Sequence, residues 1–382
     1  DELCRQMGRP ISQCGGEMNG FEERARYMID KSEQALENII SKKNEQIINA
    51  DQFASHLIWM DQEPMLPERN YIFRFNNSYI NGKITDLVHS ININSYENFI
   101  DEFKPDIIHS HLYFSELVCH ENSRPNIKYF SHLHSNRSVF KKKTVFNFFS
   151  KKSIYEVFEK NRLLTKYKKA NIKFISISSD TYRFFTIEMP QNTNDLLSLP
   201  NAINLSRFKL LNKTFSEKKI KLITVGSLVA KKNQIFLVEV VNYIKNKNYD
   251  VHLKIIGDGL EREKIQNRIL ELNLTENIKL SGKQDLIEEQ LKKADFYVHS
   301  ATYEPFGLVI LEAMASRLAV VSLNGSGNSD IIDNRINGFI LSENNYKLFG
   351  DIVINLFSKP KEYTKIVNKG YENALNYDIK VY

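Results

Sequence analysis

The carboxyl-terminal half of the chain alternates short apolar runs with amphipathic stretches of helical period. The apolar runs predict strands at 220–225, 251–256, 278–280, 296–299, 318–323 and 339–341. The amphipathic stretches predict helices at 233–245, 261–272, 285–294 and 308–315. Strands of near-continuous apolar character that alternate with helices are typical of an α/β domain, in which helices cover both faces of a parallel sheet. Ligands of such a doubly wound domain bind at the carboxyl ends of the strands.

The amino-terminal half has a less regular pattern. It predicts strands at 106–109, 127–130 and 174–177, a further candidate strand at 57–60 and a long polar helix at 20–48. Turn residues and charges between Pro200 and Lys219 indicate a linker. Because 382 residues are about twice the usual domain size, we expect two domains. Their expected bounds are 1–205 with an atypical start at 1–70, a linker at 206–219, and 220–376.

The composition, 42% hydrophobic and 26% charged residues, is typical of a globular protein. No apolar run approaches the roughly 18 residues that span a bilayer, and the first residues predict no signal peptide. The chain also lacks an initiator Met, as a processed protein or a fragment would. Cys4, Cys14 and Cys119 show no metal-ligand spacing and fit a reducing compartment, so we expect a cytoplasmic protein.

Positive charge is concentrated in one segment, 141–173, which holds eleven basic residues against Glu156 and Glu159. Aromatic residues such as Phe146 and Phe148 lie between the charges. Such a segment could lie on an anionic bilayer, which would place the protein peripherally at the inner face of the membrane. No nucleic-acid motif accompanies it, so we expect no nucleic-acid partner. The alternative is an amphipathic helix whose lysines are merely solvated.

The stretch from Glu304 to Glu312 suggests a ligand with hydroxyl groups at both ends and phosphate between them. Pro305 keeps Glu304 out of the following helix, and Glu312 lies inside it, so the two carboxylates are roughly 12 Å apart along the axis. The unpaired amides at 306–308 form an anion site at the positive end of the helix dipole. A nucleotide sugar has this layout. The alternative is an ordinary core helix with two incidental acids.

A second candidate for phosphate binding follows the first strand of the carboxyl-terminal domain. Gly226 ends that strand, and Lys232 at the start of the next helix is placed to reach a phosphate. The segment lacks the Gly-Lys-Ser/Thr of a P-loop, and a solvated lysine pair is the alternative. Gly257-Asp258-Gly259 reads as a tight turn, since the Gly-x-Gly-x-x-Gly pattern is absent. Flexible backbone at 324–330 could approach a diphosphate.

The sequence gives little indication of a metal site. It contains no Asp-x-Asp pair that could chelate Mg²⁺ or Mn²⁺ on a diphosphate. Histidines cluster at His109, His111, His132 and His134, near the ends of the first-domain strands. Zinc is one explanation, but no Cys or acid stands at ligand spacing. One imidazole that lines a cleft, with the others packed around it, is the explanation we prefer.

In order and spacing these motifs resemble glycosyltransferase family 4, also called glycosyl transferases group 1. The resemblance also includes 104–111, Ser178 and 199–203 upstream and Asn337-Gly338-Phe339 downstream. The resemblance covers about 100–376. It implies a retaining, nucleotide-sugar-dependent enzyme of the GT-B fold, in which two Rossmann-like doubly wound domains face a cleft. The amino-terminal domain, on the acceptor side, would be atypical here.

Matched position by position, the resemblance implies roles for individual residues. Three residues would be catalytic. Glu304 would bind the donor-sugar hydroxyls, and Lys232 would contact the donor diphosphate. His134, with His132 as the alternative, would lie in the cleft near the sugar. Glu312 would hold the nucleotide ribose. The remaining donor-binding positions would be Gly226, Ser227, Phe306, Gly307 and Leu308, with the last three contributing their amides to the distal phosphate.

The expected function is transfer of a hexose-type sugar from a nucleotide diphosphate sugar to a saccharide or lipid-linked acceptor, in surface polysaccharide or glycoconjugate synthesis, without metal or other cofactor. The base, the sugar and the acceptor stay open. Ser227 stands where the family usually has Arg, and we expect 377–382 to be the truncated start of the family's crossover segment. These departures favour an alternative, an inactive relative that binds nucleotide sugars or acts as a scaffold.

Overall fold

The computed structural model describes residues 96–98, 100–101, 104–111, 116, 119, 122–136, 160–161, 163–168, 171–208 and 219–380. The helix predicted at 20–48, the strand candidate at 57–60 and most of the basic segment lie outside these residues. The chain divides into two compact units, Asp1–Ser131 with Val157–Ile172 and His132–Glu156 with Lys173–Tyr382. The domain bounds expected from the sequence stay a prediction. None of the described helices is long and apolar enough to cross a bilayer.

The amino-terminal sheet has the strand order β1-β2-β3-β4. Its strands are β1 (Ile107–His111), β2 (Lys128–Leu133), β3 (Ile172–Ser176) and β4 (Leu196–Ser198). The first three confirm the predicted strands to within a few residues. The sequence did not predict β4, which has only three residues and pairs in parallel with β3. Between them lies α6 (Ser179–Glu188), which Ser178 begins with a reciprocal capping box to Thr181.

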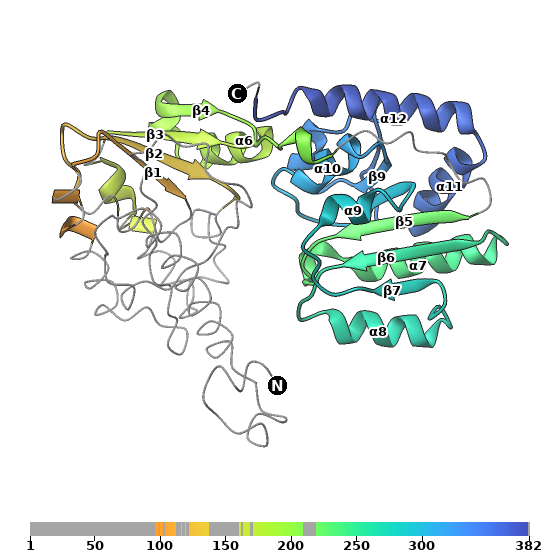
Figure 1. Ribbon diagram of the computed structural model, residues 1–382. Coiled ribbons are helices and arrows are strands. Elements are labelled where there is room, and N and C mark those ends of the chain that lie inside the picture. Colours follow the sequence, from red (N-terminus) through yellow and green to blue (C-terminus); the bar gives the residue numbers. More distant parts are fainter. Residues whose placement is uncertain are drawn as a thin grey trace, which may run out of the picture. The chain divides into compact units, whose positions relative to one another are not determined.

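The carboxyl-terminal sheet is fully parallel, in the order β10-β9-β8-β5-β6-β7 (Figure 1). Its strands are β5 (Ile220–Val225), β6 (Val251–Ile256), β7 (Ile278–Leu280), β8 (Phe296–His299), β9 (Ala319–Leu323) and β10 (Phe339–Leu341). The sequence predicted all of them to within one residue. Short, apolar, β-branched runs bounded by glycine or charge leave little choice of register or type.

Helices connect these strands and extend past the last one. They are α7 (Gln234–Asn246), α8 (Arg262–Glu271), α9 (Ile287–Leu291), α10 (Leu308–Ala315), α11 (Tyr346–Phe357) and α12 (Pro360–Leu375). Short 3-10 turns lie at Pro190–Asp195, Leu205–Arg207, Ala230–Lys232 and Gly327–Asp330. The helix expected at 285–294 is only half as long as predicted, and α11 and α12 were not predicted.

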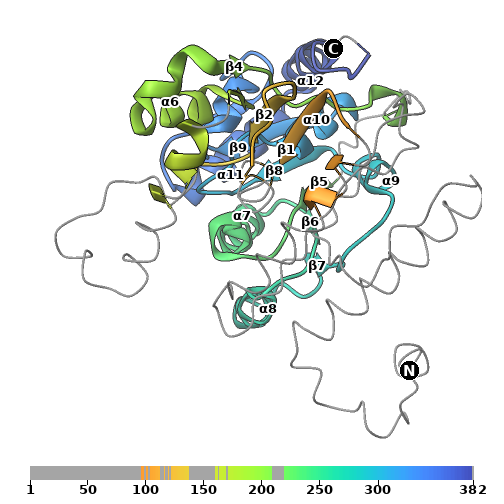
Figure 2. The same ribbon diagram turned by 90° about the vertical axis from the view of Figure 1, so that its left-hand side faces the viewer.

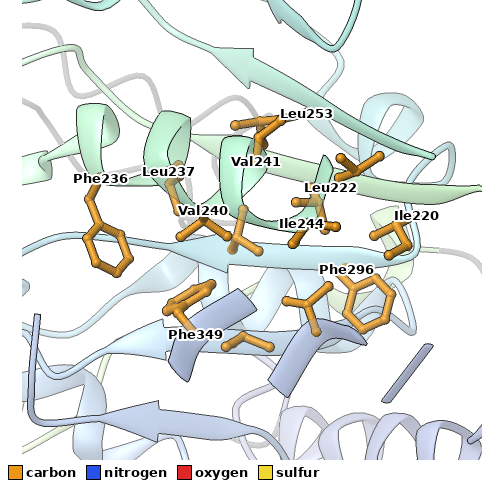
Figure 3. Close-up of a cluster of buried hydrophobic side chains, with 14 of the residues drawn as sticks. Ile220, Leu222, Phe236, Leu237, Val240, Val241, Ile244, Leu253, Phe296 and Phe349 are labelled. Atoms are coloured by element: carbon orange, nitrogen blue, oxygen red, sulfur yellow. The ribbon is translucent and has the colours of Figure 1, made fainter. Parts of the chain in front are cut away.

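Two apolar clusters lie on opposite faces of the carboxyl-terminal sheet. Figure 3 shows the first, in which α7 packs Leu237, Val241 and Ile244 onto Leu222 and its neighbours in the sheet. Each such side chain, fully buried, contributes about 1.5–3 kcal/mol to folding. The second cluster is formed mainly by α10 on the other face. Apolar side chains therefore pack on both faces of the sheet, as the sequence predicted, although the face of β6 that carries His252 and Lys254 is only half-buried.

The segment after α12 returns to the region before β5. The Ile203 amide donates to the Tyr377 carbonyl (2.8 Å), and the Ile379 amide donates to the Ile203 carbonyl (2.9 Å). The Tyr377 ring also packs against Phe306, with ring centroids 5.9 Å apart. Residues 377–379 therefore have a defined place against the end of the predicted first domain.

Candidate functional site

Two loops meet backbone to backbone at the carboxyl ends of β5 and β6. The Gly226 amide donates to the Ile256 carbonyl (3.0 Å), and the Leu228 amide donates to the Asp258 carbonyl (3.0 Å). Gly257 has φ +134, and a Cβ there would stand 1.9 Å from the Gly226 carbonyl oxygen. Only glycine therefore permits this contact. The turn predicted at 257–259 is present, and it fixes the loop that leads to Lys232.

Lys232 and Glu304 form the centre of the site. Lys232 Nζ lies 2.5 Å from Glu304 Oε2, and both side chains are largely buried. His299, at the end of β8, places Nε2 3.2 Å from the same oxygen. The backbone reinforces the pair, because the Ser300 hydroxyl donates to the Lys232 carbonyl (2.8 Å). Two strand–helix connections, β5–α7 and β8–α10, thus bring a lysine, an imidazole and a carboxylate together.

The charge state of this cluster follows from its surroundings. Burial alone would raise the pKa of Glu304, but the His299 contact and the Lys232 charge lower it to about 2. Burial lowers the pKa of His299, and the Glu304 contact opposes that shift only in part. The ring is therefore neutral at pH 7, with Nδ1 3.2 Å from the Tyr297 hydroxyl. The cluster holds an ionised Glu304 against an ammonium group and a neutral imidazole.

The loop after β9 holds the Glu304 backbone in place. The Glu304 amide donates to the Gly325 carbonyl (2.7 Å), and the Gly327 amide donates to the Glu304 carbonyl (2.9 Å). A Cβ at Gly327 would stand 1.8 Å from the Pro305 carbonyl oxygen. The glycine-rich stretch 324–330, which the sequence proposed as a diphosphate contact, therefore has a structural role as the support of Glu304.

α10 begins directly after this loop, at Gly307, whose φ is +105. In the part of the chain that the structure describes, no hydrogen-bond acceptor faces the amides of Phe306, Gly307 and Leu308. Phe306 is buried and Leu308 is exposed, so this helix end has both an anchor in the core and a surface open to a ligand. The amides and the helix dipole would favour an anion there, and the role of 306–308 in donor binding stays a prediction.

Glu312 lies more than one turn inside α10, and its environment is the reverse of that of Glu304. Burial raises the pKa of Glu312, Arg207 opposes this shift, and Glu288 adds to it, so that the pKa is about 7. Arg207 is committed to Glu288, with 3.1 Å between Nη2 and Oε2. The Glu312 carboxylate therefore has no ammonium or guanidinium partner comparable to Lys232.

His134 follows β2 directly, and its ring stacks on His132 with centroids 4.6 Å apart. Two residues later the Asn136 amide donates to the Tyr303 hydroxyl (2.7 Å), within the same compact unit. Tyr303 immediately precedes Glu304 in the chain. The loop that carries His134 thus contacts the loop that carries Glu304, while the choice between His134 and His132 as the cleft residue stays a prediction.

The sequence did not identify His299 and Tyr303 as members of the site. His299 is the last residue of a predicted buried strand, a position at which a buried polar side chain points to a partner. Tyr303 lies under Lys231, with the ammonium 6.0 Å from the ring centroid. The Ser227 side chain adds no charge to the site, and its carbonyl accepts from Gln234 Nε2 (3.1 Å).

One group among the described residues could supply three metal ligands. His109 and His111 of β1 and His132 of β2 have ring nitrogens within 4.8 Å of one another. Burial and the neighbouring His111 lower the pKa of His109 to about 4, so that imidazole is neutral at pH 7. The Lys232 cluster, by contrast, has one carboxylate and an ammonium group, a combination that does not suit a cation.

Comparison with known proteins finds a family model that matches part of the second unit. Residues 207–373 match the family model described as glycosyl transferases group 1. The chain is 27% identical over 220 residues to an Escherichia coli UDP-Gal:alpha-D-GlcNAc-diphosphoundecaprenol alpha-1,3-galactosyltransferase, covering 52% of this chain and 57% of that protein. It is 24% identical over 217 residues to a Bacillus subtilis poly(glycerol-phosphate) alpha-glucosyltransferase, covering 56% and 30%. The match thus spans less than two thirds of either curated relative.

Solved structures establish the fold over more of the chain. The Anabaena protein Alr3699/HepE, solved with UDP and glucose, aligns with a TM-score of 0.64 at 17% identity, covering 81% of this chain and 82% of that one. A sucrose-phosphate synthase from Thermosynechococcus elongatus aligns with a TM-score of 0.66 at 16% identity, covering 84% of each. The protein has the GT-B fold, as the sequence predicted.

Proposed function

We propose that this protein, whose residues 207–373 form a glycosyl transferases group 1 domain, transfers a hexose-type sugar from a nucleotide diphosphate sugar with retention of configuration. The acceptor would be a saccharide or a lipid-linked saccharide in surface polysaccharide or glycoconjugate synthesis. The observation that carries the proposal is the ion pair of Lys232 and Glu304 beside the open amides of α10. An anion site and a buried carboxylate at the carboxyl ends of parallel strands suit a donor with both phosphate and hydroxyl groups.

The chemistry would depend on stabilising the departing diphosphate. The Lys232 ammonium and the amides at 306–308 are fixed positive groups, and fixed dipoles cost no reorganisation when charge develops. Glu304, kept ionised, would accept hydrogen bonds from the sugar hydroxyls, and Glu312, with its pKa raised to about 7, lies along α10 where the ribose is expected. The acceptor would attack the face from which the leaving group departs, its proton would pass to a diphosphate oxygen, and no protein nucleophile would be needed. We propose that no metal takes part, because the sequence contains no Asp-x-Asp pair.

Substitution of Lys232 tests the proposal directly. Lys232→Ala should reduce transfer from UDP-, GDP- or ADP-sugars by at least about a hundredfold, the usual loss when a main electrostatic group is removed. Lys231→Ala is the matched control, because the neighbouring ammonium is directed over the Tyr303 ring. Its turnover should stay near that of the unmodified protein. Near-normal transfer by Lys232→Ala would contradict the assignment.

One observation favours a second candidate, an inactive relative that binds nucleotide sugars or acts as a scaffold. Ser227 puts no positive side chain where the resemblance led us to expect an arginine. Lys232 would then be the principal cation for the diphosphate. A thermal-shift panel of nucleotide sugars separates the candidates when it is combined with an assay of released nucleotide. Ligand-dependent stabilisation without any release, in the presence of varied acceptors, would favour the inactive relative.

We also propose that the basic segment 141–173 contacts an anionic membrane surface. Within 141–173 the described helical residues include Leu163, Lys166 and Tyr167, all buried. Part of the segment therefore packs, as the alternative stated, although Lys166 is buried rather than solvated and Lys168 and Lys173 are exposed. Co-sedimentation with anionic and neutral vesicles at low salt tests the membrane contact, and equal recovery in the supernatant would count against it.

A further inference from the structure

One face of the carboxyl-terminal sheet carries an unusual row of basic side chains. In the strand register Lys221 of β5 lies opposite His252 of β6, and Lys254 of β6 lies opposite Lys279 of β7. Directly paired residues of neighbouring parallel strands point to the same face, and residues two apart on one strand also share it. These four side chains therefore lie side by side on one face.

Among the described residues this face is only partly covered, because α9, the helix on that side, has five residues. Figure 2 shows α7 and α8 on one side of β5, β6 and β7 and α9 on the other, at the level of β5. Alternation in β6 confirms the difference, since Val251, Leu253 and Ile255 are buried whereas His252 and Lys254 are half-buried. A strand covered on both faces would be apolar throughout. This face lies where the sequence predicted a helix of ten residues and the structure has α9, with five.

The lysines line a groove of about 540 Å³, and a fourth, Lys293, completes the set after α9. Gln266, Thr275 and Asn277 also line it, which adds amide and hydroxyl groups to the four ammonium groups. The groove lies along the first halves of β5 and β6. The Lys232 and Glu304 cluster is at the opposite, carboxyl-terminal edge of the same sheet.

In this row His252 Nε2 lies 2.8 Å from Asp250 Oδ1, so the charge without a carboxylate partner among the described residues belongs to the lysines. Among the described residues no carboxylate lies within 4.0 Å of any of the four ammonium groups, although Glu276 is at the rim. Lys254 Nζ instead donates to Gln290 Oε1 (2.6 Å), and burial lowers the pKa of Lys254, with Lys293 and Lys279 adding to the effect. On the other face of the sheet Arg268 is paired with Glu239 at 2.6 Å.

We propose that this groove binds a polyol-phosphate chain, with the lysines on its phosphodiesters and the amide and hydroxyl groups on its free hydroxyls. Lysine is a strong point-charge partner for phosphate. The groove is concave, which does not suit a flat bilayer. It is lined by no Phe, Tyr or Trp, which a single-stranded nucleic acid needs for base stacking. The proposal concerns binding alone and does not depend on sugar transfer.

The test compares two double variants of the full chain. Lys254→Gln with Lys279→Gln removes charge from the groove, and Lys359→Gln with Lys369→Gln removes the same charge from the exposed surface of α12. Binding of a fluorescent glycerol phosphodiester oligomer is measured over a range of salt concentrations. Neutral polyglycerol and single-stranded DNA are the comparison ligands. Equal melting temperatures and an equal UDP-sugar response show that fold and donor site are intact.

The groove variant should bind the oligomer at least about tenfold more weakly than the α12 variant, since each charge-assisted contact is strong. In a plot of log affinity against log salt concentration, the slope for the groove variant should be shallower by about 0.7 for each lysine removed. Equal affinities of the two variants would overturn the proposal, because binding would then depend on other basic residues. If the unmodified protein bound single-stranded DNA or neutral polyglycerol as tightly as the glycerol phosphodiester oligomer, the assigned ligand would be overturned.

Discussion

Glu312 should make the protein less stable as the pH rises from 5 to 7.5. The change to test is Glu312→Gln, which keeps the shape of the side chain and removes its titration. In the native protein burial raises the pKa of this carboxyl from 4.5 to about 7. The native state therefore holds a proton over a pH range in which the unfolded chain has already released it. Stability from this group is complete below pH 4.5 and is lost as the pH rises through 7.

The magnitude follows from linkage. Each pH unit over which only the native state holds the proton costs about 1.4 kcal/mol of unfolding free energy. Between pH 5 and 7.5 the difference in bound protons integrates to somewhat less than two pH units, so the native protein loses about 2–2.5 kcal/mol from Glu312. Glu312→Gln avoids this loss. The free energy of unfolding of the variant relative to the native protein should thus rise by about 2 kcal/mol over the range.

The assay is thermal unfolding of both proteins at pH 5 and pH 7.5 at constant ionic strength. About 2 kcal/mol corresponds to roughly 4–8 °C in melting temperature for a domain of this size. Other titrating groups are shared by both proteins and cancel in the comparison. Glu372→Gln, an exposed glutamate on α12, is the matched control. A Glu312→Gln effect that is the same at both pH values would refute the reasoning, since it would mean that burial does not hold the proton.

Other consequences can be tested in the same way. The native protein should lose stability as the pH falls from 4.5 to about 2, because the pKa of Glu304 is lowered to about 2, and Glu304→Gln should remove this loss. Acid unfolding curves of the variant and the native protein measure the difference. Coincident curves would exclude the Lys232 pairing. Gly327→Ala should cost at least about 3 kcal/mol, because its Cβ would meet the Pro305 carbonyl oxygen at 1.8 Å. Gly282→Ala, where no atom lies within 4 Å of the added Cβ, should cost about 1 kcal/mol for its positive φ alone, and urea unfolding of the two variants should rank them in that order.

The sequence predicted the strands of the carboxyl-terminal sheet well because their apolar runs are short and bounded by glycine or charge. It failed at β4, which has only three residues, Leu196–Ser198, too few to show a strand pattern. It also overestimated α9. Residues 285–294 have helical spacing, but the Lys292–Ala294 turn closes the helix before the spacing ends. Local patterns identify the buried elements and miss those that tertiary contacts define.

The candidate site was predictable in its members but not in their contacts. The spacing of Gly226, Lys232, Glu304 and Glu312 could be read from the chain. Nothing in that spacing showed that Lys232 and Glu304 would meet, since they are 72 residues apart and join only when β5 and β8 pair. His299 was missed for the same reason. Its role depends on a neighbouring connection rather than on its own segment.

The two glutamates of this segment have pKa values shifted in opposite directions because the fold gives them different partners. His299 and Lys232 keep Glu304 ionised, whereas Arg207 is held by Glu288 and burial raises the pKa of Glu312 to about 7. A diphosphate that binds at the α10 amides would compete for the Lys232 ammonium, and Glu304 would then need hydroxyl donors to replace it. A ligand that brings phosphate and sugar hydroxyls together supplies both replacements at once. Under the proposed function the leaving group, a nucleoside diphosphate, would supply only the phosphate at this pair, so the pair would favour the nucleotide sugar over its leaving group.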